Sequence, residues 1–135
     1  MVVSSEDEVE TARVAAELTM PGIPCDVADD VALAGLVQGT VATLGGIDIL
    51  VCNAGITGQA GPLADIDMAD YARVMAINLR SQVVLTNAAL PHMVQRGGGA
   101  AILISSLSGL RGNGRINAYA LAKAGVAQLA RNLAV

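Results

Sequence analysis

The chain is poor in aromatic and basic side chains. Its 135 residues include no Phe or Trp, two Tyr, one His and one Lys, and the formal net charge is −4. Nucleic acids need concentrated positive charge, so they are excluded as partners. No run approaches the ~18 uninterrupted apolar residues of a membrane span, and no signal pattern opens the chain. We therefore expect a cytoplasmic protein that does not use a membrane as partner.

Cysteine is also scarce. Cys25 and Cys52 lack the close spacing of a metal-binding or redox pair, so we expect two buried free thiols and no metal site. Hydrophobic residues nevertheless make up 53% of the chain, and most of them are Ala, Val, Leu and Ile. A core of small and branched aliphatic side chains suits helices packed on a buried parallel sheet. The length fits one domain over residues 1–135.

Apolar segments alternate with helical patterns along the chain. The pattern predicts that MVVSS, residues 1–5, is the end of a short strand, and it predicts further strands over 22–27, 47–52 and 100–105. It predicts helices from Ser5 to Leu18, from Asp29 or Asp30 to about Leu44, from Asp67 to about Arg96, and from Asn117 onward. Strands separated by helices of this length indicate an α/β fold, with a doubly wound parallel sheet and helices on both faces.

The only lysine of the chain, Lys123, stands four residues after Tyr119 in the last predicted helix. Side chains at i and i+4 leave a helix on one face. A phenol has a pKa near ~10, and an ammonium within a few ångströms favours the phenolate. The pair is therefore either a tunable proton donor and acceptor or an accident in an alanine-rich helix.

Three other polar positions interrupt apolar segments. Ser105 and Ser106 end a predicted strand, where a hydroxyl can hold a substrate carbonyl, or where serines simply form a turn. Asn78 is unfavourable within the helical segment VMAINL, so it is either exposed or marks a local distortion of the helix. The break at 53–55 (Asn-Ala-Gly) is a ligand-binding edge or a plain turn.

The segments CDVAD, VCNAG, MAINL, ISSLSG and YALAK occur in this order over essentially the whole chain. Together they resemble the short-chain dehydrogenase/reductase family. The resemblance implies a Rossmann-like fold and an NAD(P)-dependent oxidoreductase that interconverts a secondary alcohol and a ketone. The catalytic tetrad that it implies is Asn78, Ser106, Tyr119 and Lys123. The cofactor contacts that it implies are Asp26, Val27, Asn53, Ala54, Gly55, Tyr119 and Lys123.

The same resemblance implies a role for each tetrad member. Ser106 polarises the substrate oxygen, and it is preferred to its neighbouring serines because the family's serine lies thirteen positions before the tyrosine. Tyr119 exchanges the proton, Lys123 favours the phenolate and holds the nicotinamide ribose, and Asn78 anchors a water. The loop LSGLRGNGRI is similar to that of bacterial 3-oxoacyl-carrier-protein reductases, whereas nothing identifies the substrate.

The family's glycine-rich turn, G-x-x-x-G-x-G, does not occur in the chain. We therefore expect a partial Rossmann-like domain that lacks the family's first strand, and that binds dinucleotide poorly and turns over little alone. The alternative is a catalytically silent fragment that retains only a helix-pairing surface.

The resemblance also implies a homodimer or homotetramer through the helices over 67–96 and 117–135. Glu6 and Asp7 follow the first strand, where an acidic group holds a ribose 2′-hydroxyl and favours NAD over NADP. The other interpretation is that these two residues simply favour the start of a helix.

Overall fold

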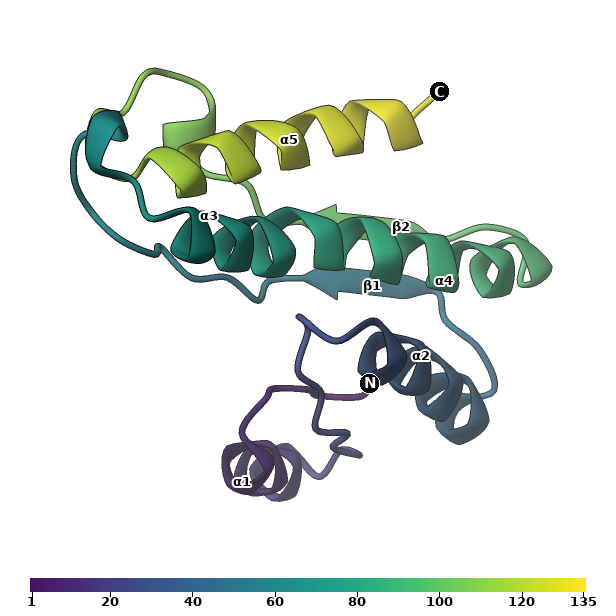
Figure 1. Cartoon of the computed structure of the whole chain (residues 1–135). Coiled ribbons are helices and arrows are strands. Elements are labelled where there is room, and N and C mark those ends of the chain that lie inside the picture. Colours follow the sequence, from purple (N-terminus) through teal and green to yellow (C-terminus); the bar gives the residue numbers. More distant parts are fainter. The chain divides into compact units, whose positions relative to one another are not determined.

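The computed structural model describes all residues, 1–135. Figure 1 shows its helices and strands. The helices are α1 (Glu8–Leu18), α2 (Asp30–Leu44), α3 (Met68–Met75), α4 (Ser81–Gln95) and α5 (Asn117–Leu133), and the strands are β1 (Ile49–Cys52) and β2 (Ala100–Leu103). Two short 3₁₀ turns, η1 (Leu63–Asp65) and η3 (Leu107–Gly109), lie in loops, and a π-helical segment, η2 (Ala76–Arg80), joins α3 to α4.

The chain divides into two compact units. The first unit comprises Met1–Leu50 and Val84–Ala101, and the second unit comprises Val51–Val83 and Ile102–Val135. The division falls within β1, β2 and α4, so each of these elements contributes residues to both units. We describe each unit by itself.

In the first unit, residues 3–5 pair with residues 21–25 through three backbone hydrogen bonds. Val3 and Gly22 form an isolated parallel bridge, in which the Ile23 amide donates to the Val3 carbonyl over 3.0 Å. The predicted strands over 1–5 and 22–27 are therefore too long. The Cys25 amide still donates to the Ser5 carbonyl over 2.8 Å, but beyond Ser5 the chain turns towards α1, where the Ser5 hydroxyl accepts from the Asp7 amide.

The first two helices begin with aspartate caps. Asp7, not Ser5, caps α1, and its carboxylate accepts a hydrogen bond of 2.9 Å from the Glu10 amide. A capping box from Ser5 was the wrong prediction, because a carboxylate two residues closer to the helix satisfies the same free amides. Asp29 caps α2 as predicted, and Gly45, with φ of 77°, ends it.

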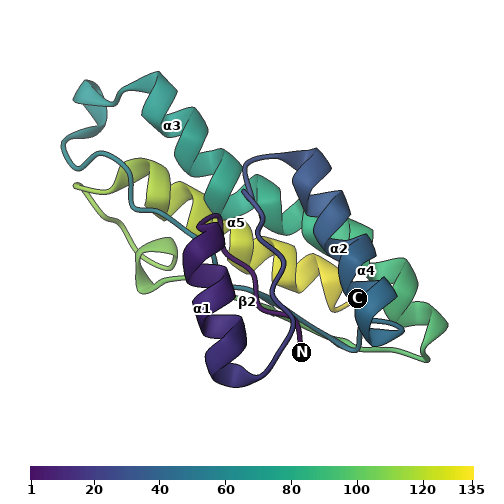
Figure 2. The ribbon, with the colours of Figure 1, turned by 90° about the horizontal axis from the view of Figure 1, so that it is seen from below.

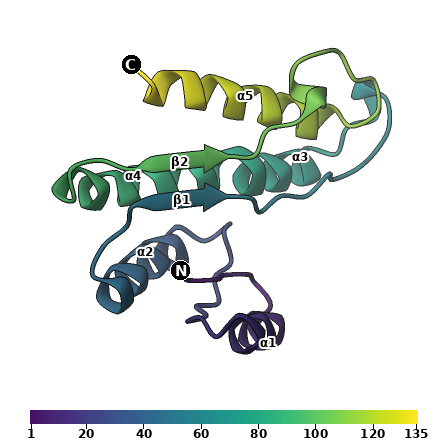
Figure 3. The ribbon, with the colours of Figure 1, turned by 180° about the vertical axis from the view of Figure 1, so that it is seen from behind.

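The two strands form a two-stranded sheet. The Ala100 amide donates to the Asp48 carbonyl over 2.9 Å, and the Ile104 amide donates to the Cys52 carbonyl over 3.1 Å. Figure 3 shows both arrows pointing the same way, as in a parallel pair. The predicted strands over 47–52 and 100–105 and the α/β fold class are confirmed, with slightly shorter strands.

In the second unit, α5 packs against α3 and the π-helical segment (Figure 2). Ala118, Ala122 and Val126 recur every four residues along α5 and are buried. Leu79 packs over Gly125, where a Cβ would lie 2.7 Å from a Leu79 methyl. The small residues of α5 therefore admit a neighbouring segment within this unit. Cys25 and Cys52, one in each unit, are buried free thiols as predicted.

Candidate functional site

All of the predicted site residues except two lie in the second unit. The 53–55 segment follows β1, Asn78 lies in the π-helical segment, and Ser105 and Ser106 follow β2. Tyr119 and Lys123 lie on the first two turns of α5. Four segments far apart in the sequence thus contribute to one compact unit.

Asn78 is completely buried and holds the loop that follows β1. Its Nδ2 donates to the Ile56 carbonyl over 2.7 Å and to the Val74 carbonyl over 3.0 Å, and its Oδ1 accepts from the Ile56 amide over 3.1 Å. Of the two sequence interpretations, the local distortion is confirmed, because Asn78 lies in the π-helical segment. A π segment inside an α-helix is rare and is frequently found at functional sites.

Gly55 lies against both Asn78 and Lys123. A Cβ at this position would lie 2.5 Å from Asn78 Oδ1 and 3.6 Å from Lys123 Nζ. The first distance is too short for two unbonded heavy atoms, so this backbone approaches the amide as closely as only glycine permits. Asn53 and Ala54 are exposed beside it.

Lys123 is buried, although it carries an ammonium group. Its side chain is only 3% exposed, and Nζ donates to the Ile104 carbonyl over 2.6 Å. Nζ also lies 5.6 Å from the centre of the Tyr119 ring, within the range of a cation–π contact. Burial lowers the pKa of Lys123 below its ordinary value of 10.5, because desolvation disfavours the charged form.

The two serines after β2 have different contacts. The Ser105 hydroxyl donates to the Lys123 carbonyl over 2.7 Å, so this serine is tied to α5. The half-buried Ser106 caps η3, and its oxygen accepts from the Ser108 amide over 3.2 Å. The Ser106 and Tyr119 hydroxyls therefore each keep a proton that is not donated within the chain, which a hydrogen-bond acceptor on a substrate can use.

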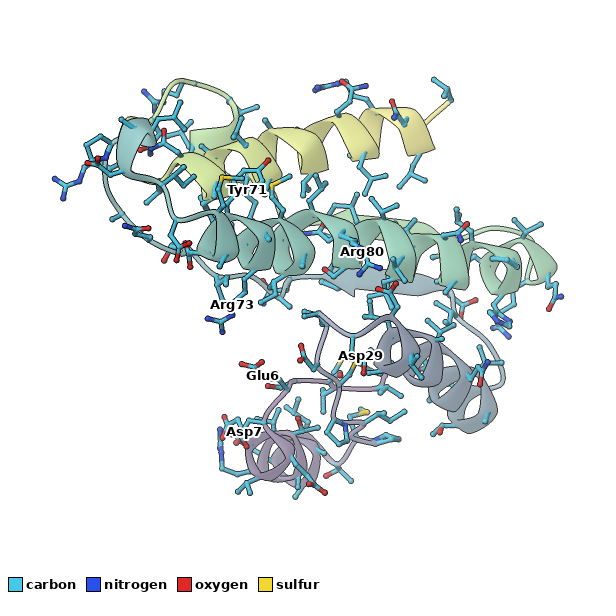
Figure 4. The ribbon with its side chains drawn as sticks, viewed as in Figure 1. Glu6, Asp7, Asp29, Tyr71, Arg73 and Arg80 are labelled. Atoms are coloured by element: carbon cyan, nitrogen blue, oxygen red, sulfur yellow. The ribbon has the colours of Figure 1, made fainter.

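Asp26 and Val27 belong to the first unit. The Asp26 carboxylate is exposed and accepts from the Ala28 amide over 2.8 Å. Their predicted contact with an adenine ring stays a prediction. Figure 4 shows Glu6 and Asp7 at the start of α1, where Asp7 serves as the helix cap.

Sequence reasoning missed the contacts that hold the site. Ser105 was considered only as an alternative to Ser106, and nothing indicated that Ile56 and Ile104 would offer their backbone groups to Asn78 and Lys123. Backbone partners leave no mark on residue identity, so no sequence signal could have found them. The structure contains no cluster of three or more His, Cys, Asp or Glu that could hold a metal, and none of its helices has the length and apolar character to cross a bilayer.

Comparison with known proteins identifies similar sequences over most of the chain. A family profile described as enoyl-(acyl carrier protein) reductase matches residues 1–135. The chain is 40% identical over 110 residues to cis-4-hydroxycyclohexanecarboxylate dehydrogenase of Sinomonas cyclohexanicum. This alignment covers 82% of this chain and 44% of that protein. It is 34% identical over 111 residues to 2-dehydro-3-deoxy-L-rhamnonate dehydrogenase (NAD(+)) of Sphingomonas sp. (strain SKA58). This second alignment covers 82% of this chain and 45% of that protein.

Among solved structures, levodione reductase superposes with a TM-score of 0.91 at 30% identity. The match covers 98% of this chain and 54% of that one. The chain belongs to the short-chain dehydrogenase/reductase family and has part of its Rossmann-like fold. It spans about half the length of the curated relatives that it matches.

Proposed function

We propose that this chain carries the catalytic residues of an NAD(P)-dependent oxidoreductase that interconverts a secondary alcohol and a ketone. The observation that supports this most directly is the buried Lys123 ammonium, 5.6 Å from the Tyr119 ring and hydrogen-bonded only to a backbone carbonyl. Burying an ammonium without an anionic partner costs free energy, and such groups are concentrated at functional sites.

In this proposal Tyr119 is the general acid and base. In the direction of alcohol oxidation, its oxygen takes the proton of the substrate hydroxyl, while Ser106 donates a hydrogen bond to the same substrate oxygen. The nearby positive charge of Lys123 favours the phenolate that accepts the proton. A bound nicotinamide would supply the hydride acceptor in oxidation and the hydride donor in reduction.

Asn78 supports the site through the loop after β1. Both of its amide hydrogens are donated to backbone carbonyls. We therefore assign its side chain to holding Ile56, and with it the 53–55 segment, rather than to binding a water through Nδ2. This segment, Tyr119 and Lys123 would hold the nicotinamide half of the cofactor, since Gly55 brings the segment against both Asn78 and Lys123.

Fewer observations bear on the choice between NAD and NADP. Glu6 and Asp7 favour NAD in this proposal, because a carboxylate repels a 2′-phosphate. The relative from Sphingomonas sp. carries NAD(+) in its name. Asp26 and Val27 would contact the adenine, and the small-molecule substrate is an alcohol or ketone. Association into a homodimer or homotetramer would use the surfaces of the helices over 67–96 and 117–135.

A catalytically silent role is the second candidate, and one observation favours it. Apolar side chains at the ends of the strands remain exposed in the second unit: Val51 by 54%, Ile102 by 48% and Ile104 by 39%. Exposed β-branched residues on neighbouring strands promote association. In this second candidate the chain binds copies of itself or a longer relative and turns over no substrate.

Substitution of one tyrosine distinguishes the two candidates. We expect Tyr119→Phe to lower the rate of alcohol oxidation about 100-fold or more, because the phenol proton is lost. The measurement is nicotinamide reduction with a panel of secondary alcohols, together with calorimetric titration of NAD and NADP. Tyr71→Phe is the matched control. Tyr71 is the only other tyrosine, half-buried on α3 of the same unit (Figure 4).

Equal activity of Tyr119→Phe and the unsubstituted chain would contradict the first candidate. Absence of both turnover and cofactor binding in the unsubstituted chain would favour the second.

A further inference from the structure

Two hydrogen bonds in opposite directions join the end of β2 to a single residue of α5. The Lys123 ammonium donates to the Ile104 carbonyl over 2.6 Å, and the Ser105 hydroxyl donates to the Lys123 carbonyl over 2.7 Å. Consecutive residues thus hold both ends of the same lysine, its backbone and the tip of its side chain. We call this pair of hydrogen bonds the lysine clasp.

We propose that Ser105 is a positioning residue, which holds α5 at the place where the Lys123 ammonium lies beside the Tyr119 ring. This inference rests on the proposed function and adds a residue to it. Ser105 touches neither substrate nor cofactor in this proposal. It acts through Lys123 and through the adjacent Ser106.

The clasp matters because the one hydrogen bond of the ammonium goes to the Ile104 carbonyl. A lysine side chain has four rotatable bonds, and burial is the only influence found on the pKa of Lys123, so no charged neighbour directs it. Its position therefore depends on where the α5 backbone lies and on the Ile104 carbonyl. A displacement of about 1 Å at a catalytic group is enough to lower a rate substantially.

The turn after Ser105 is also packed directly on this part of α5. A Cβ at Gly109 would lie 2.6 Å from the Lys123 carbonyl carbon and 2.6 Å from the Ala124 nitrogen. The backbone of η3 therefore touches α5 at the residue that the Ser105 hydroxyl holds. Ser106 caps this same turn, so the hydroxyl that faces the substrate in our proposal is placed relative to Lys123 by one short segment.

A simpler interpretation is that Ser105 only stabilises the fold, and the sole lysine allows a test that separates the two. When the chain is labelled with isotopic lysine, its NMR spectrum contains a single lysine side-chain signal, which belongs to Lys123. We expect Ser105→Ala to shift this signal and to raise the titration midpoint of Lys123 towards 10.5, because the ammonium becomes more hydrated. Where turnover is measurable, we expect kcat to fall about 10- to 100-fold.

Two further variants complete the experiment. Thr43→Val removes a hydroxyl that donates to a backbone carbonyl over the same 2.7 Å, on α2 of the first unit, and we expect it to leave the lysine signal unchanged. Ser105→Thr keeps the hydroxyl, and we expect its lysine signal and titration to match those of the unsubstituted chain. It also keeps the test valid if Ser105→Ala does not fold.

The inference is overturned if folded Ser105→Ala shows the same lysine signal and titration as the unsubstituted chain, or if Ser105→Thr alters them as much as alanine does. A loss of thermal stability with an unchanged lysine signal would likewise assign Ser105 to the fold alone. The lysine signal is read without substrate or cofactor, so failure of the clasp and failure of the Tyr119→Phe test are separate results.

Discussion

At the scale of single residues, the site depends on two side chains that would be unfavourable elsewhere. An asparagine within a helix competes for backbone hydrogen bonds, and a buried lysine loses the hydration of its charge. Asn78 is tolerated because the hydrogen bonds of its side chain go to backbone groups of Ile56 and Val74. Lys123 is tolerated because the Ile104 carbonyl accepts from it. Positions where sequence conflicts with local preference are expected at functional sites.

Gly55 gives a test at this scale. We expect Gly55→Ala to lower the free energy of unfolding by about 1–3 kcal/mol, since the new methyl group would displace the Asn78 amide from Ile56. Gly112→Ala is the control, because a Cβ at Gly112 meets nothing within 4 Å and its φ is not positive. Urea unfolding of both variants measures the difference. Equal stability of the two would show that the loop yields without cost.

At the scale of elements, the helices were predictable because their ends are marked by residue type. Asp29 and Gly45 bound α2, and Asp67 opens α3, as the sequence indicates. The strands were less predictable, since pairing depends on which backbone groups are free on the neighbouring segment. The pairing of residues 3–5 with residues 21–25 illustrates this, because it ends at the turn after Ser5 rather than where the apolar residues end.

The cap of α1 gives a test at this scale. The sequence predicted that this helix starts at Ser5, whereas it starts at Glu8 with Asp7 as its cap. We expect Asp7→Ala to lower the free energy of unfolding by about 1 kcal/mol, because the Glu10 amide loses its acceptor. Ser5→Ala is the matched comparison, and we expect it to cost less, since its oxygen accepts only a longer bond of 3.3 Å from Asp7. Thermal unfolding followed by circular dichroism compares the two. A larger loss in Ser5→Ala would restore the capping box as the start of this helix.

At the scale of the whole molecule, the sequence predicted the family and the α/β class but not the assembly of the site. The order of five motifs was sufficient to predict the family, because the order of motifs is visible in a sequence and contacts between them are not. It did not reveal that Ser105 binds α5, since a hydroxyl at the end of a strand has many possible partners. Nor did it reveal that Asp26 and Val27 belong to a different compact unit from the rest of the predicted site.

Exposed apolar residues give the test at this scale. We expect the chain to associate at micromolar concentration and the triple variant Val51→Thr, Ile102→Thr, Ile104→Thr to associate less, because it removes exposed methyl groups from neighbouring strands. Val9→Thr, at a single 80%-exposed position on α1, is the control. Sedimentation velocity measures the association. A monomeric unsubstituted chain would contradict this prediction.

The π-helical segment limits how this chain can change in length. The i→i+5 winding of Ala76–Arg80 holds about one residue more than α-helical winding over the same turn, so deleting one residue there would leave the side chains from Ser81 onward facing as they do now. The change would fall on Asn78, whose side-chain bonds to the Ile56 backbone depend on the local winding. A shortened segment should therefore keep the direction of α4 and release the loop after β1.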